Sequence, residues 1–309
     1  MLRFILRRLI YGIITLWVLI TLTFILMHNL PGDPFANSQK LGPEAKAVLM
    51  KTYGLDQPIY VQYGSYLKKI ATFDFGVSFN YPTRSVNEVL KQTFPTSAEL
   101  GMYAIIVAVI IGLILGIVAA LNHNKGWDYV AMLTAIIGVS APAFVIGPLL
   151  SYFIGVKLGW LPPALWKGPE YKILPTITLA FGTLATMARM MRTSMLDVVN
   201  QDYVKTAKSK GLSRFAVVVK HTIRNAMLPI ITILGVAVVN ITTGAFVVEQ
   251  IFAVPGMGKF FVQSISTNDY TMIMGMTIFY AALLIIAIMV TDVLYGVVDP
   301  RIRLAKGGK

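Results

Sequence analysis

Six long stretches of mainly apolar residues constrain this chain more than any other feature of its sequence. A helix needs about 20 such residues to cross the roughly 30 Å hydrocarbon layer of a lipid bilayer. The stretches that approach or exceed this length are residues 9–27, 98–121, 129–156, 173–189, 228–252 and 272–297. They lack the strict alternation of barrel strands, and helices satisfy their own backbone hydrogen bonds in lipid. The sequence therefore predicts an all-α integral membrane protein with six transmembrane helices.

The composition agrees with this interpretation and excludes several other classes of protein. Hydrophobic residues make up 56% of the 309 residues and the mean hydropathy is +0.69, which is too apolar for an ordinary water-soluble protein. The absence of cysteine excludes disulfides, thiolate catalysis and cysteine-ligated metal centres. The net charge of +13 comes from cations beside the apolar stretches, so we expect contacts with membrane lipid and no nucleic-acid partner.

The distribution of Lys and Arg predicts how the chain is oriented in the membrane. If the N-terminus is cytoplasmic, six spans return the C-terminus to the cytoplasm, and most cations of the short loops then lie inside. We expect residues 1–30 to form the N-terminal cytoplasmic end and first span, 31–97 a small extracytoplasmic insertion, and 98–309 a five-span core. The insertion should fold, because it offers apolar side chains to bury. These are Tyr53, Leu55, Ile59, Tyr60, Tyr63, Tyr66 and Leu67.

The segment 195–229 is a basic island between two apolar stretches and must lie in water. Eight Lys and Arg residues occur between Met187 and Leu228. Each would cost about 2.5 to 3.5 kcal/mol at the bilayer centre, or on the order of 20 kcal/mol together. We expect Arg189 and Arg192 to end the fourth span on the cytoplasmic side.

Within the basic island we expect two helices separated by a bend. Asp202 is the expected N-cap of the first helix, and Gly211 suits a left-handed terminus. Ser213 can cap a second helix that runs towards Pro229. The apolar face of the first helix, with its cationic border, suits either a membrane surface or a groove on a partner protein.

The same segment resembles the cytoplasmic loop of ABC importer membrane subunits, and in particular their peptide-importing branch. Residues 203–212 read Tyr-Val-Lys-Thr-Ala-Lys-Ser-Lys-Gly-Leu, and Leu228-Pro229 follows. The general pattern has an acidic first position that is missing here and a shorter glycine-to-proline spacing, but the peptide branch shares these departures. Further motifs resemble that branch along nearly the whole chain. They include Leu30-Pro31-Gly32-Asp33-Pro34, Asp74-Phe75-Gly76-Val77-Ser78, Asp269-Tyr270 and Val298-Asp299-Pro300-Arg301.

The resemblance implies the B-type permease subunit of an oligopeptide or dipeptide ABC importer, with six transmembrane helices of the type I importer kind. It implies a heterodimer with a second permease subunit, two cytoplasmic ATPase subunits and an extracytoplasmic peptide-binding protein, in the inner or plasma membrane of a prokaryote. Such a subunit has no catalytic residues and no cofactor. Dipeptides, nickel chelates and glutathione are alternative substrates to oligopeptides. The implied ATPase-coupling residues are Asp202, Tyr203, Val204, Thr206, Ala207, Lys210, Gly211 and Leu212.

Other kinds of site find less support in the sequence. The nearest approach to a P-loop, Gly258-Lys259, lacks the following hydroxyl residue. The three histidines have no metal-ligand spacing, so no metal site is expected. Asn240 and Thr243 are weak candidates for lining a pathway, and small or polar residues there equally allow close helix packing. Glu249 and Asp292 are expected near span ends, at the level of the lipid headgroups. An ion-coupled secondary transporter, which sparse intramembrane carboxylates disfavour, and a membrane scaffold stay open as alternatives.

Overall fold

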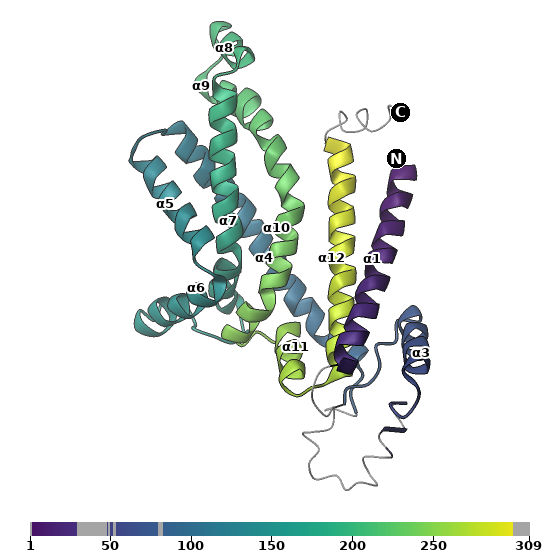
Figure 1. Ribbon diagram of the computed structural model, residues 1–309. Coiled ribbons are helices and arrows are strands. Elements are labelled where there is room, and N and C mark those ends of the chain that lie inside the picture. The colour runs from purple at the N-terminus through teal and green to yellow at the C-terminus, as the bar shows by residue number, and fades with distance from the viewer. Residues whose placement is uncertain (1, 30–47, 49, 52–53, 80–82, 299–309) are drawn as a thin grey trace. The chain divides into compact units, whose positions relative to one another are not determined.

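The computed structural model describes residues 2–29, 48, 50–51, 54–79 and 83–298, and these are helical almost throughout (Figure 1). Within these residues, β structure is limited to one antiparallel bridge between Val77 and Ser85. The helices are α1 (Leu2–Asn29), α3 (Ile59–Ala71), α4 (Val86–Leu121), α5 (Gly126–Ser140), α6 (Ala143–Leu150), η2 (Ser151–Lys157), α7 (Pro169–Val199), α8 (Asp202–Ser209), α9 (Arg214–Ala216), η3 (Val217–Ile223), α10 (Arg224–Ile251), α11 (Met257–Ser266) and α12 (Tyr270–Val298). The predicted all-α class is confirmed.

Among the described residues, four helices are long and apolar enough to cross a membrane alone. They are Ile5–Asn29, Val86–Leu121, Pro169–Val199 and Tyr270–Thr291, and a bent pair of helices supplies a fifth candidate. The 28-residue helix α10 covers the predicted stretch 228–252 except for its last residue, Phe252, which is the C-cap. The structure is thus compatible with six spans, and that number stays a prediction.

The predicted third span, 129–156, is not one continuous helix. It is divided into α5 and the run of α6 and η2, and the two parts are bent by 113° at the break. Ala141 has an extended backbone at the break, with φ −95° and ψ 117°. Pro142 follows it, and a proline disfavours helical geometry at the preceding residue. The prediction of an unbroken span was wrong because it followed the apolar run across this proline.

The described chain forms two compact units. The first unit contains Met1–Pro95 and Gly256–Ile286, and the second contains Thr96–Pro255 and Ala287–Lys309. The predicted organisation by membrane topology, with boundaries at residues 30 and 97, stays a prediction.

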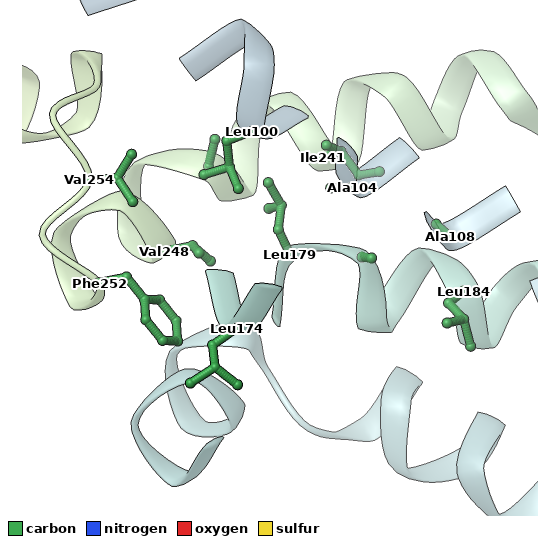
Figure 2. Close-up of a cluster of buried hydrophobic side chains, with 12 residues drawn as sticks. Leu100, Ala104, Ala108, Leu174, Leu179, Leu184, Ile241, Val248, Phe252 and Val254 are labelled. Carbon is green, nitrogen blue, oxygen red and sulfur yellow. The ribbon is translucent and has the colours of Figure 1, made fainter. Parts of the chain in front are cut away.

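The core of the second unit lies between α4, α7 and α10. Figure 2 shows its largest cluster, in which Leu100 of α4, Leu174 of α7 and Phe252 after α10 are completely buried. Small residues allow the helices to approach closely. A Cβ atom at Gly116 of α4 would lie 2.6 Å from the carbonyl oxygen of Ala188 in α7.

Helix α5 packs against α7 in the same way. Along one face of α5 the buried residues are Asp128, Ala131, Ala135 and Gly138, which recur every three or four positions. A Cβ atom at Gly138 would lie 2.6 Å from the Cβ atom of Ala185 in α7. Glycine is therefore required at both Gly116 and Gly138 for contact with α7.

One hydrophobic cluster of the first unit is built around Phe24 of α1 and Phe79, Tyr270 and Met274. Three of the predicted insertion residues, Leu55, Tyr63 and Tyr66, pack against this cluster, as expected. Burial raises the pKa of the Tyr66 hydroxyl above its ordinary value. Ile59 and Tyr60 are instead exposed, and Tyr53 lies outside the described residues.

Asp269 joins two motifs of the first unit that lie far apart in the sequence. Its carboxylate accepts hydrogen bonds from the Ser78 hydroxyl and from the backbone N–H of Phe79. It also accepts a bond from the backbone N–H of Met272 at 3.1 Å, which caps the start of α12. The motif 74–78 and the dipeptide Asp269-Tyr270 therefore meet in the folded chain.

Candidate docking helix and neighbouring cleft

Helix α8 contains most of the predicted coupling residues, and it divides them between two faces. Val204 and Ala207 are buried, and they pack with Val217 of η3 and with Val198. Tyr203, Thr206, Lys210 and Leu212 are exposed. The buried pair holds α8 against its own chain, so the opposite face is left for contact with another molecule.

The start of α8 differs from the prediction by one residue. The N-cap is Gln201, whose side chain makes no capping hydrogen bond, and Asp202 is the first helical residue. Asp202 pairs instead with Lys205, at 3.0 Å between Oδ1 and Nζ. The prediction of Asp202 as the cap was wrong, because aspartate is favourable both at the cap and in the first turn of a helix.

The end of α8 confirms the predicted left-handed terminus at Gly211, which has φ +77°. The Gly211 N–H donates to the Lys208 carbonyl at 3.0 Å, and the Leu212 N–H donates to the Ala207 carbonyl at 3.4 Å. These two bonds are the pair that defines a Schellman terminus. A Cβ atom at Gly211 would meet nothing within 4 Å, so glycine is needed for its backbone angle and not for space.

The second helix of the basic island begins as predicted and continues past Pro229. The Ser213 hydroxyl accepts a hydrogen bond from the Ala216 N–H at 3.3 Å, which confirms it as the cap. Helical geometry then continues through α9, the π-helical segment η3 and α10, with Pro229 inside α10. The segment against which α8 packs is therefore continuous with a long apolar helix.

The N-terminal part of α10 packs against α7. Met187, Met191 and Met195 of α7 are buried in a cluster with Ala226 and Ile230 of α10. The Ser194 hydroxyl also donates to the Ala226 carbonyl at 2.9 Å. The methionines thus serve packing, for which their adaptable side chains are well suited.

An ion pair between the buried Asp128 and the half-buried Arg192 joins α5 to α7. Arg192 binds the Asp128 carboxylate through both of its oxygens, at 2.6 Å and 2.7 Å. Asp128 also accepts from the Asn124 backbone N–H at 2.9 Å, and His123 lies 3.2 Å away. The helix α7 continues past Arg189 and Arg192 to Val199, and the predicted end of the fourth span at these two residues stays a prediction.

A cleft of about 360 Å³ lies in the second unit, where the break between α5 and α6 faces α7 and α10. Its lining is mainly apolar, with threonine hydroxyls from α7. The lining residues are Ala141, Pro142, Ala143, Thr178, Leu179, Phe181, Gly182, Thr183, Thr186, Met187, Ile233 and Ala237. This volume is within the range of small-molecule sites.

The other residues that the sequence analysis singled out do not form a further site among the described side chains. The backbone at Asn240 and Thr243 is helical in α10, but their side chains lie outside the described ones, as does that of Asp292. Glu249 is completely buried near the end of α10. Gly258-Lys259 lies in the first turn of α11. Within the described residues, no three His, Asp or Glu side chains gather in a group able to hold a metal ion.

Comparison with known proteins places these features in a family. Residues 112–304 match the family described as "Binding-protein-dependent transport system inner membrane component", and residues 1–101 match the corresponding N-terminal family model. The chain is 48% identical to the "Dipeptide transport system permease protein DppB" of Bacillus subtilis (strain 168), over the full length of both. It is 42% identical to the "Oligopeptide transport system permease protein OppB" of Haemophilus influenzae and of Escherichia coli (strain K12), covering 98% of this chain and 100% of each relative.

A solved structure supports the same fold at lower sequence similarity. It is titled "Crystal structure of an amino acid ABC transporter with histidines" and matches with a TM-score of 0.53 and 17% identity, covering 67% of this chain and 92% of that chain. The family models and full-length relatives carry the assignment: this chain belongs to the family of binding-protein-dependent transport system inner membrane components.

Proposed function

We propose that this membrane permease subunit imports peptides, oligopeptides foremost, and that α8 is the element through which separate ATPase subunits drive it. The observation that carries the proposal is that one face of α8 is packed against its own chain while the other is exposed. Val204 and Ala207 hold it to η3, while Tyr203 and Leu212 expose apolar surface beside a cationic border. The full-length relatives named for dipeptide and oligopeptide transport support the substrate class.

The proposed cycle uses ATP and substrate only through their different affinities for two conformations of the pathway. Two cytoplasmic ATPase subunits dimerise on ATP and pull on α8, and a second permease subunit completes the pathway. An extracytoplasmic binding protein delivers the peptide. Because α8 is bound to η3, which continues into α10, movement of α8 reaches a membrane helix without an intervening loop.

In the proposed topology, both termini and α8 lie in the cytoplasm of a prokaryote and the segment 31–97 lies outside. The absence of native cysteine makes this topology directly testable, since any thiol introduced is the only one in the chain. Thr206→Cys in α8 and Tyr60→Cys in α3 are a matched pair, because both positions are exposed. We expect a membrane-impermeant maleimide added outside to label only Tyr60→Cys. Labelling of Thr206→Cys from outside would contradict the topology.

The transport activity is tested by reconstituting the chain with its partner subunits in proteoliposomes. We expect uptake of peptides of increasing length to require ATP and the binding protein. Uptake that follows a proton or sodium gradient without ATP would instead establish a secondary transporter. A complex that assembles but moves no peptide would favour a scaffold role.

The docking role of α8 is tested in the same complex by crosslinking. A thiol at Thr206, on the exposed face, should crosslink to an ATPase subunit, whereas a thiol at the buried Val204 should not. The Val204→Cys variant is the matched control, because it lies in the same helix and differs only in its face. If neither thiol crosslinked to an ATPase subunit, docking at α8 would be contradicted.

A further inference from the structure

The exposed faces of α5 and α7, which pack together in the second unit, have opposite chemistry. α5 exposes large side chains suited to lipid, namely Tyr129, Val130, Leu133, Ile136, Ile137 and Val139. Between positions 182 and 193 of α7, the exposed residues are Gly182, Thr186, Arg189 and Thr193. A line of glycine, threonine and arginine along a helix of membrane-crossing length is unsuited to lipid and indicates contact with water or a polar partner.

This polar line of α7 begins inside the cleft. Gly182 and Thr186 belong to its lining, and Arg189 follows one turn later on the same face of the helix. The Thr186 hydroxyl donates to the Gly182 carbonyl at 3.0 Å. Its oxygen therefore keeps lone pairs that can accept a hydrogen bond from a ligand N–H group.

Arg189 and Arg192 lie one turn apart on α7 but differ in how their charges are balanced. Arg192 is held by the Asp128 carboxylate. Arg189 donates only a long bond, 3.4 Å, to the Ala135 carbonyl. In the part of the chain that the structure describes, no carboxylate forms an ion pair with Arg189. Arg189 therefore presents an exposed guanidinium whose charge no described acid neutralises.

The chemistry of this face matches one end of a peptide. A guanidinium presents a planar fork of donors that fits both oxygens of a carboxylate. Every unmodified peptide carries a C-terminal carboxylate whatever its sequence, and its last amide N–H groups need acceptors. A permease that passes many sequences benefits from binding a group that they share, and only weakly enough to release it.

We propose that Gly182, Thr186 and Arg189 of α7 form a transit site for the C-terminal end of a peptide. Arg189 binds the carboxylate, Thr186 accepts a peptide N–H, and the cleft receives the last side chain. The inference rests on the proposed peptide import, and it adds the end of the peptide that is recognised and the residues that recognise it.

The test measures ATP-dependent uptake by the complete importer of one peptide in two forms, with a free C-terminal carboxylate and with a C-terminal amide. For each form, the rate of a variant is divided by the rate of the original chain. This ratio removes the selectivity of the binding protein, which is the same in every preparation. We expect Arg189→Gln to lower the ratio about tenfold for the carboxylate form, because a tenfold change corresponds to the loss of one charge-assisted hydrogen bond. The ratio for the amide form should be unchanged.

Two further variants sharpen the result. Arg189→Lys keeps the charge but loses the fork, so its loss for the carboxylate form should lie between those of the original chain and Arg189→Gln. Lys167→Gln removes an exposed cation from the segment before α7, and both peptide forms should be taken up normally. Equal losses for both forms with Arg189→Gln, or no loss for either, would overturn the transit site.

A lipid phosphate is the rival ligand for Arg189, and it has a separate signature. In that case Arg189→Gln changes uptake of both peptide forms alike, and the change depends on the fraction of anionic lipid in the vesicles. This outcome overturns the transit site but leaves peptide import intact. Failure of the original chain to import either form with ATP would overturn the proposed function itself.

Discussion

The short helix α8 buries more side chains completely than the longer helix α3 does. α8 has eight residues, two of them buried apolar side chains, whereas α3 has 13 residues and none that is fully buried. α3 is held by half-buried tyrosines and by polar contacts such as Tyr63 with Thr21 and Gln62 with His28. Burying one aliphatic side chain contributes about 1.5 to 3 kcal/mol, against about 0.5 to 1.5 kcal/mol for a hydrogen bond that can exchange with water. The docking role proposed for α8 would require the first kind of attachment.

The largest effect is expected from Val204→Asp, which places a carboxylate among Ala207, Val217 and Val198. An unpaired buried charge costs several kcal/mol, so α8 should detach from η3. We expect ATP-dependent uptake to fall more than tenfold. Limited trypsin digestion of the purified chain measures detachment directly, because Lys205 and Lys208 become easier to cleave.

Two variants bracket that result. Val204→Ala keeps the site apolar and should cost about 1 to 2 kcal/mol. Thr206→Asp adds the same charge on the exposed face and should leave the digestion rate unchanged. If Val204→Asp digested no faster than Thr206→Asp, the apolar contact would not be what holds α8.

An intermediate effect is expected from Gly211→Val, because valine is strained at φ +77°. The left-handed conformation costs about 1 to 2 kcal/mol for a residue with a Cβ atom. The strain should shift the end of α8 and lower peptide uptake more than ATP hydrolysis, as measured in the same proteoliposomes. Gly211→Asn is the matched control, since asparagine tolerates this conformation and should retain coupling. Normal uptake and peptide-stimulated hydrolysis with valine would show that this terminus does not matter for coupling.

The smallest effect is expected from Tyr63→Phe in α3. The change removes the 2.6 Å hydrogen bond to Thr21 but keeps the ring contact with Phe24. The loss should be below about 1 kcal/mol and below that of Val204→Ala. Thermal unfolding of purified Tyr63→Phe and Val204→Ala under the same conditions shows which variant loses more stability. A larger shift for Tyr63→Phe would reverse the comparison between α3 and α8.

Local features of the site were predictable because their causes lie within a few residues. Gly211 and Ser213 follow rules of helix termini that act over one turn, and both predictions hold in the structure. The break at Pro142 was also within reach, since a proline acts on its immediate neighbour. It was missed because the apolar run continues on both sides of it.

Contacts between distant segments were not predictable from one sequence. Asp128 and Arg192 are 64 residues apart, and Ser78 and Asp269 are 191 residues apart. Nothing in the residue pattern pairs one acid with one base or hydroxyl among the several available. The exposed polar line on α7 was not predicted for a related reason. A hydropathy window averages over all faces of a helix, and the presence of Arg189 alone does not indicate which face of the helix is exposed.

The glycines of α4 and α5 limit the ways in which this protein can move. Gly116 and Gly138 each bring a neighbouring helix into direct backbone contact with α7, from α4 and from α5. Helices in such contact can neither spin nor slide independently, because the first step would drive a Cβ or carbonyl atom into its neighbour. These contacts favour movement of the packed segments of α4, α5 and α7 together. A movement of α7 would also displace the part of the cleft wall that α7 forms.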